Sequence, residues 1–383
     1  MRRIYLDNAA STPMDPEVFE CMKPWMLEFA GNPSSTHSHG RHIRNAIEQA
    51  RRTIAGHLGA HPHEIYFTSG GTEADNMAIH AAVTAGGARH IITTSIEHHA
   101  VTHPVEHLVH TGAVSVTWLP VDCEGHISLD DLREALATHP HSLVSLMHGN
   151  NEIGTLHDIQ AIAELCQQYG AYFHSDTVQT MGTSRFNLAE TPIHFLTASA
   201  HKFYGPKGVG FLYIRKGTPV SPLISGGGQE RNLRAGTENP AAIIGMAFAL
   251  DKCYRTLDAK NAHLRTLKER MYAGLRDVLP GVFVNGCMDP ARSLPTVLNV
   301  TLPCGDVDCM LLFSLDLAGI SASGGSACNS GANQGSHVLR GIQAPPVALN
   351  NSVRFSFGVQ NTEEEIDYTV SKLAEMVRSQ VPA

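Results

Sequence analysis

Lys202 occupies a position where a lysine side chain could act as a nucleophile. It follows the largely apolar run 193–198 and the polar residues Ser199 and His201. A lysine at the end of an apolar strand is partly desolvated, which lowers its pKa and suits it to Schiff-base chemistry. Lys207 lies in a Gly-Pro-Lys-Gly turn, where we expect it to be solvated. Lys202 is therefore the better candidate for a catalytic lysine.

Asp176 ends a second strand-like run, 171–175. In doubly wound sheets, ligands bind at the carboxyl ends of the strands. A buried aspartate there could pair with a protonated ring nitrogen, which pyridoxal phosphate requires as an electron sink. The alternative, a capping aspartate in a loop, would be favoured if no companion lysine were present. Lys202 is such a companion.

Two glycines and a threonine, Gly70, Gly71 and Thr72, separate a short apolar run from a helical one. Such a turn offers backbone N–H groups and the positive end of a helix to a phosphate. It lacks the Gly-Lys-Ser/Thr of a Walker loop and the spacing of a dinucleotide fingerprint. Taken alone, the segment is explained equally well as a tight turn with a threonine cap.

Cys328 lies in a segment of small residues, 321–331. A cysteine of the core would normally have apolar neighbours, so we expect this thiol on an exposed, mobile loop. Such a thiol can carry a sulfur atom between sites, and its reactive form is the thiolate. The seven other cysteines include no C-x-x-C pair, and most of them are expected to be buried thiols.

The elements that must position these residues follow from the hydrophobic pattern. Strand-like and helical runs alternate, which predicts βα units around a mostly parallel sheet. The predicted strands cover 64–67, 90–93 and 142–147, and the predicted helices cover 72–83, 99–110 and 159–169.

After about residue 250 the pattern changes to that of a smaller α+β domain. A long amphipathic stretch, 251–279, leads into predicted strands at 296–300 and 353–356 and a closing helix from Glu363. We therefore predict an α/β protein with two domains. The large domain covers 14–255, and the small domain covers 1–13 and 256–383 and carries the Cys328 loop.

Composition excludes several classes of partner. With 43% hydrophobic and 17% charged residues the chain is typical of a globular protein, and its formal net charge of −8 includes no basic block for nucleic acid. No run reaches the roughly 20 apolar residues of a membrane span, and no signal-peptide core follows Met1. We expect no direct nucleic-acid or membrane partner and a cytoplasmic location.

Taken together, these motifs resemble a cysteine desulfurase of the class V aminotransferase group, in its NifS/IscS-like branch. The similarity runs from residues 5–13 through 31–35 to 352–358. It implies the fold type I of pyridoxal-phosphate enzymes and a homodimer. It also implies conversion of L-cysteine to L-alanine, with the sulfur held as a persulfide on Cys328. A sulfur-acceptor protein would then use it for Fe–S clusters, thio-modified tRNA or other products.

The resemblance also implies which residues hold pyridoxal phosphate and the substrate. Lys202 would form the Schiff base, and His98 would stack on the cofactor ring and carry a proton. Asn151 and Arg354 would bind the substrate carboxylate. The implied cofactor-binding residues are Gly71, Thr72, His98, Asn151, Asp176, Gln179, Ser199, His201, Lys202 and, reaching into the site of the other subunit, Thr237.

Competing interpretations remain for some of these residues. His98, His99 and His103 could share a ligand face of a helix, but no cysteine or carboxylate partner is evident, so no metal site is predicted. A selenocysteine lyase or cysteine sulfinate desulfinase would need the same cofactor residues without a mobile thiol, and Cys328 argues against it. A sulfur carrier without catalysis would not need both Lys202 and Arg354.

Overall fold

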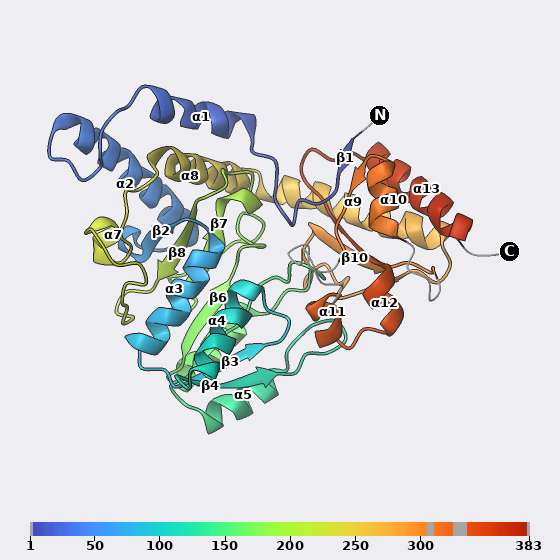
Figure 1. Cartoon of the computed structure of the whole chain (residues 1–383), viewed down its shortest axis with the longest axis horizontal. Coiled ribbons are helices and arrows are strands. Elements are labelled where there is room, and N and C mark those ends of the chain that lie inside the picture. The colour runs from blue at the N-terminus through green and yellow to red at the C-terminus, as the bar shows by residue number, and fades with distance from the viewer. Residues whose placement is uncertain (1–2, 305–309, 325–334, 381–383) are drawn as a thin grey trace.

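The computed structural model describes residues 3–304, 310–324 and 335–380. Cys309 and Cys328 lie outside these residues. Figure 1 shows a larger body that contains the central sheet and, beside it, a smaller body built from the C-terminal part of the chain.

A seven-stranded sheet forms the centre of the larger body. Its neighbouring strands run parallel, except that β8 is antiparallel to β2 and β7. Strands such as β3 and β7 are buried along their whole length, as expected where helices cover both faces of a sheet. In spatial order the strands are β2 (Ile65–Thr68), β8 (Gly210–Ile214), β7 (Phe195–Ser199), β6 (Tyr172–Asp176), β5 (Leu143–Ser145), β3 (His90–Thr94) and β4 (Ser115–Leu119).

Helices cover both faces of this sheet and form two hydrophobic cores with it. One face packs against α3 (Gly71–Thr84) and α4 (His99–His110). The other face and the helices beyond it form the larger core. These helices are α1 (Pro16–Leu27), α2 (Ser38–Leu58), α5 (Leu129–Thr138), α6 (Ile159–Gln168) and α8 (Pro240–Arg255), and the short turns η1 (Pro62–Glu64), η2 (Ala200–Lys202) and α7 (Gln229–Asn232) connect other elements.

The smaller body has its own core, which lies between a three-stranded antiparallel sheet and long helices. The N-terminal strand β1 joins this body, because it pairs in parallel with β11. The strands are β12 (Ser352–Ser356), β10 (Val297–Thr301), β9 (Phe283–Val284), β1 (Ile4–Tyr5) and β11 (Ile320–Ser321). The helices are α9 (Leu257–Val278), α10 (Leu311–Leu317), α11 (His337–Gly341), α12 (Pro346–Asn351) and α13 (Glu363–Gln380).

The structure confirms the mostly parallel sheet and the βα units, with strand and helix ends shifted by only one or two residues. The stretch 251–279 is divided, because α8 ends at Arg255 and α9 begins at Leu257. The division into 14–255 and 1–13 with 256–383 stays a prediction, supported by the pairing of β1 with β11. No helix of the described residues is long and apolar enough to cross a membrane.

Candidate active site

The carboxyl ends of β6 and β7 open into a cavity of about 430 Å³. Parallel neighbouring strands bring their carboxyl ends to one edge of the sheet, and Asp176, the last residue of β6, pairs with Thr197 of β7, two residues before Ser199. Most of the predicted site residues line this cavity: Gly71, Thr72, His98, Asn151, Asp176, Gln179, Ser199, His201, Lys202 and Arg354.

The start of α3 forms one wall of the cavity. Gly70 caps the helix without a side-chain hydrogen bond, so the first backbone N–H groups of α3 stay available for an anion. A Cβ atom at Gly71 would lie only 2.7 Å from Val178 Cγ2, so this close approach needs glycine. A second cavity of about 460 Å³ shares Gly71, Thr72 and Ser199. A small anion such as a phosphate fits this corner.

Asp176 supplies a buried carboxylate at the floor of the cavity. Its Oδ1 accepts a hydrogen bond from Val178 N at 2.8 Å. Burial, together with the nearby Asp75 carboxylate, raises the pKa of Asp176 to about 7. The hydrogen bond from Val178 N and the charges of His174 and Lys202 oppose this rise in pKa. A cationic group of a ligand would satisfy this carboxylate, as the protonated nitrogen of a pyridine ring does.

Lys202 lies in η2, directly after β7, and its ammonium group reaches the N-terminal segment. Lys202 Nζ donates to the carbonyl oxygen of Ala10 at 3.0 Å and to that of Ala9. Gln179 Nε2 also donates to the Ala9 carbonyl, at 2.9 Å. The amine that could react with an aldehyde is thus held at the cavity wall by backbone carbonyls.

His98 caps the N-terminus of α4 and lines the cavity. Its Nδ1 accepts a hydrogen bond from Ala100 N at 3.1 Å, so the proton of the neutral ring lies on Nε2. Burial and the neighbouring charge of Lys202 lower the pKa of His98 to about 4. A neutral imidazole with an Nε2–H group can donate a hydrogen bond into the cavity.

Arg354 of β12 brings the smaller body into the site. Its side chain is only 3% exposed. Nη2 donates to Asp7 Oδ1 at 2.8 Å and Nη1 to the Asn151 carbonyl at 3.0 Å, while Nε has no hydrogen-bond partner among the described residues. The guanidinium group is therefore held in place with hydrogen-bonding capacity left, as the binding of a carboxylate requires.

One predicted residue that the structure describes does not line this cavity. Thr237 is exposed, on the segment between α7 and α8, so its predicted contact with another subunit is not tested in a single chain. Cys328 lies outside the described residues. Lys207 is exposed, as expected, and lines the second cavity.

Sequence analysis missed a buried aspartate–histidine pair, Asp75 and His174, at the cavity. Asp75 Oδ1 lies 3.3 Å from His174 Nε2, and both side chains are at most 1% exposed. Burial raises the pKa of Asp75 to about 7 and lowers that of His174 to about 4, so the pair is held as a neutral acid and a neutral imidazole near pH 6. The available signal was the position of Asp75 on the apolar side of α3, one turn after Gly71.

The histidines considered as metal ligands lie side by side but do not converge. The rings of His99 and His103 stack with centroids 4.5 Å apart, whereas His98 and His99 are 6.4 Å apart. His99 also contacts His337 of α11, with centroids 4.5 Å apart. Both His99 and His337 line the cavity, and sequence analysis did not assign either residue to the site.

Comparisons with known proteins agree with this geometry. The model of the aminotransferase class-V family matches residues 4–369. The protein named cysteine desulfurase IscS from Dictyoglomus turgidum is 45% identical over 378 residues, which cover 98% of this chain and 95% of that protein. A solved structure named NifS-like protein is similar with a TM-score of 0.91 at 35% identity, covering 99% and 100% of the two chains. A structure described as SspA in complex with cysteine has a TM-score of 0.81 at 33% identity, covering 92% and 98%.

Proposed function

The chain belongs to the class-V aminotransferase family, and on this premise we propose that it is a pyridoxal-phosphate-dependent cysteine desulfurase. It converts L-cysteine to L-alanine and retains the sulfur as a persulfide on Cys328. The observation that carries this function is the convergence of Lys202, Asp176 and Arg354 on one cavity. Amine, buried carboxylate and guanidinium are the three groups that an amino acid and this cofactor require.

The residues present fit pyridoxal phosphate. The free N–H groups of α3 and the close approach at Gly71 suit its phosphate. Asp176, whose pKa burial raises to about 7, suits a protonated ring nitrogen, and Lys202 Nζ is the amine that would bind the aldehyde. When bound, the cofactor supplies an electron sink for the bonds at the substrate Cα.

The side chains of the cavity bind and deprotonate the substrate. Arg354 holds the cysteine carboxylate, while Asn151 is positioned beside it by the hydrogen bond from Arg354 Nη1 to the Asn151 carbonyl. Lys202 Nζ takes the proton from Cα. Lys202, which then carries this proton, returns a proton to the product, and the Nε2–H group of neutral His98 donates a hydrogen bond in the cavity. These roles are proposals that the distances support.

Sulfur leaves the substrate by attack of the Cys328 thiolate on its Sγ atom. The C–S bond breaks, an S–S bond forms on the enzyme, and the product carbon takes up a proton to give alanine. Cysteine and an enzyme thiol thus give alanine and an enzyme persulfide, with no external oxidant or reductant. We propose that a separate acceptor protein removes this sulfur for Fe–S clusters, thio-modified tRNA or other products.

We also propose that the enzyme acts in the cytoplasm as a homodimer, in which Thr237 reaches the phosphate of the other subunit. The exposure of Thr237 in the single chain supports this arrangement. Because each site would then be completed by the partner, the isolated subunit would hold the cofactor less well.

Mass spectrometry after incubation with L-cysteine tests the function. The protein loaded with pyridoxal phosphate should produce alanine and gain one sulfur atom on the peptide that contains Cys328. A Cys328→Ser variant should keep the cofactor and lose both products. Cys123→Ser, at an exposed cysteine away from the cavity, is the matched control and should retain full turnover. If Cys328→Ser still formed alanine at the parent rate, a lyase without a sulfur-carrying thiol would be the better assignment.

A further inference from the structure

A turn between β4 and α5 presents two metal-binding side chains on one side. In the segment 121–127, Asp122 Oδ1 accepts hydrogen bonds from the backbone N–H groups of Glu124 and His126, at 2.9 and 2.8 Å. Gly125 has a φ of +85°, which other residues rarely adopt, so it allows the chain to turn back. The backbone therefore fixes the side chains of Glu124 and His126 close together.

A thiol from the smaller body completes this group. Cys287, in the loop after β9, is only 2% exposed. Its Sγ atom, a carboxylate oxygen of Glu124 and a ring nitrogen of His126 all lie within 4.8 Å of one another. Sequence analysis did not consider these three residues as metal ligands, and Cys287 is far from the other two along the chain.

His126 provides an independent indication of a ligand. It is 8% exposed, and its Nε2 atom is buried without a hydrogen-bond partner among the described residues. Nε2 lies 3.7 Å from Glu124 Oε2. Two ligand atoms bound tetrahedrally to one Zn²⁺ ion are separated by about 3.4 Å, given bonds of about 2.1 Å. A buried ring nitrogen without a partner is costly, and a metal ion would satisfy it.

We propose that Glu124, His126 and Cys287 form a Zn²⁺ site. The set of one carboxylate, one imidazole and one thiolate belongs to the ligands that zinc prefers, and three protein ligands leave a fourth position for water. Zinc binding would release the thiol proton of Cys287, because a thiol binds the metal as a thiolate.

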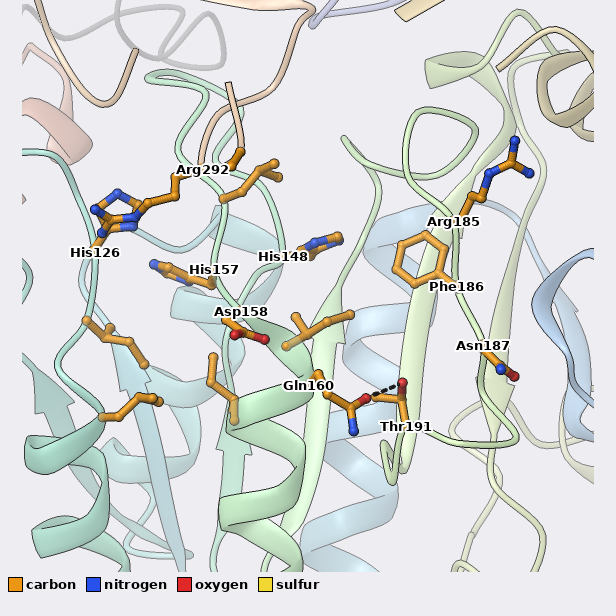
Figure 2. Close-up of a pocket in the computed structure, with 16 residues that line it drawn as sticks. His126, His148, His157, Asp158, Gln160, Arg185, Phe186, Asn187, Thr191 and Arg292 are labelled. Carbon is orange, nitrogen blue, oxygen red and sulfur yellow. Dashed lines mark hydrogen bonds between the residues drawn. The ribbon is translucent and has the colours of Figure 1, made fainter. Parts of the chain in front are cut away.

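A cavity lined mostly by residues of the larger body lies next to His126. Figure 2 shows His126 at one end of a cavity of about 570 Å³, with Arg292 beside it and His157 further in. Of the three proposed ligands, only His126 lines this cavity. The cavity does not overlap the one that holds Lys202, which separates this zinc site from the desulfurase site.

Some charged groups around the cluster favour the binding of a cation, and one opposes it. Asp122 and Glu124 are carboxylates, and the Cys287 thiolate would add a third negative charge. Arg292 Nη1 lies 4.0 Å from Glu124 Oε2 and competes with a cation for that carboxylate. The Arg292 side chain is half exposed, so it can move towards solvent when zinc binds.

Zinc at this position would join the two bodies of the protein. The turn 121–127 belongs to the larger body, and Cys287 lies in the loop after β9. Backbone bonds already connect this loop to the larger body, from Leu156 N to the Arg292 carbonyl at 2.8 Å and by a bridge between Thr155 and Ser293. A metal ion with ligands from both bodies would add a further link between them at the same junction.

Metal titration of the full-length protein loaded with pyridoxal phosphate tests this site. After removal of metal with EDTA, isothermal titration should detect one Zn²⁺ ion per chain, and Co²⁺ should give a thiolate-to-cobalt charge-transfer band. Loss of an outer-shell partner alone weakens metal binding by about 10–100-fold. Cys287→Ser and His126→Asn should therefore each weaken Zn²⁺ binding by more than ~100-fold, and Cys287→Ser should abolish the band.

Matched variants distinguish this site from other thiols. Cys123→Ser and Cys328→Ser should both keep the cobalt band. Arg292→Ala, which removes the competing cation, should tighten Zn²⁺ binding several-fold. Glu124→Gln, at a half-exposed position, covers the case in which the buried variants fail to fold, and it should weaken binding by at least ~10-fold. A cobalt band that persists in Cys287→Ser, or Zn²⁺ affinity unchanged in Glu124→Gln, would overturn the proposal.

Discussion

Replacing Arg354 with lysine tests how the enzyme binds the carboxylate of its substrate. Arg354 donates two hydrogen bonds to two partners. Nη2 donates to Asp7 Oδ1 at 2.8 Å, and Nη1 donates to the Asn151 carbonyl at 3.0 Å. A lysine keeps the charge but has a single nitrogen, so it cannot hold both partners and a substrate carboxylate in the same geometry. The substitution therefore removes directed hydrogen bonds and leaves the charge unchanged.

The magnitude follows from the number of bonds lost. One hydrogen bond between charged groups contributes about 1.5–3 kcal/mol, which corresponds to a factor of about 10–150 in binding. We expect Arg354→Lys to raise the KM for L-cysteine by at least ~10-fold. Because the guanidinium binds a group that does not react, kcat should fall less than kcat/KM.

Steady-state assays of alanine formation over a range of L-cysteine concentrations measure this effect. Arg270→Lys is the control, since Arg270 is exposed and forms ion pairs with Asp367 and Glu363 away from the site. It should leave KM unchanged. Thermal unfolding of both variants checks that the buried substitution has not unfolded the protein. An unchanged KM in folded Arg354→Lys would remove Arg354 from the substrate site.

Three further predictions follow from the site. Lys202→Ala should abolish alanine formation, and borohydride reduction of the parent should place the cofactor on the Lys202 peptide; finding it on Lys207 would contradict the assignment. Thr237→Ala should lower cofactor affinity by about 10-fold in equilibrium dialysis, the cost of one charge-assisted bond, and a fully active monomer in light scattering would refute the shared site. Burial raises the pKa of Asp75 to about 7, so its ionisation destabilises the folded protein as the pH rises from about 4 through 7. Asparagine cannot ionise; the Tm of Asp75→Asn relative to the parent should therefore rise by about 2–3 °C between pH 5 and 7, and a pH-independent difference would argue against a buried acid.

The candidate site could be predicted largely because local sequence order determines it. Asp176 ends β6, and Lys202 comes shortly after the end of β7. Because these two strands are parallel neighbours, their carboxyl ends lie at the same edge of the sheet. The turn at Gly71 starts a helix directly after a strand, which also follows from the local pattern. Where a catalytic residue stands at the end of a strand, the hydrophobic pattern of the sequence is sufficient to predict its position in the site.

Other parts of the site depend on contacts between distant segments, which periodicity does not encode. The carbonyls of Ala9 and Ala10 receive Lys202 Nζ, although nothing in these residue types indicates such a role. The antiparallel direction of β8 is another example, because a fully buried strand has the same apolar pattern in either direction. Cys287 meets His126 only after the two bodies have packed together.

Arg354 shows how this packing couples to catalysis. It lies on β12 of the smaller body, yet its two bonded nitrogens contact the N-terminal segment at Asp7 and the larger body at Asn151. The guanidinium group is oriented only when all three segments are in place, so an enzyme whose two bodies have separated would bind cysteine weakly even with its cofactor. The proposed zinc site spans the same pair of bodies at a separate point, through Cys287 and His126. Zinc there would add a second fixed point between the bodies, apart from the contacts of Arg354.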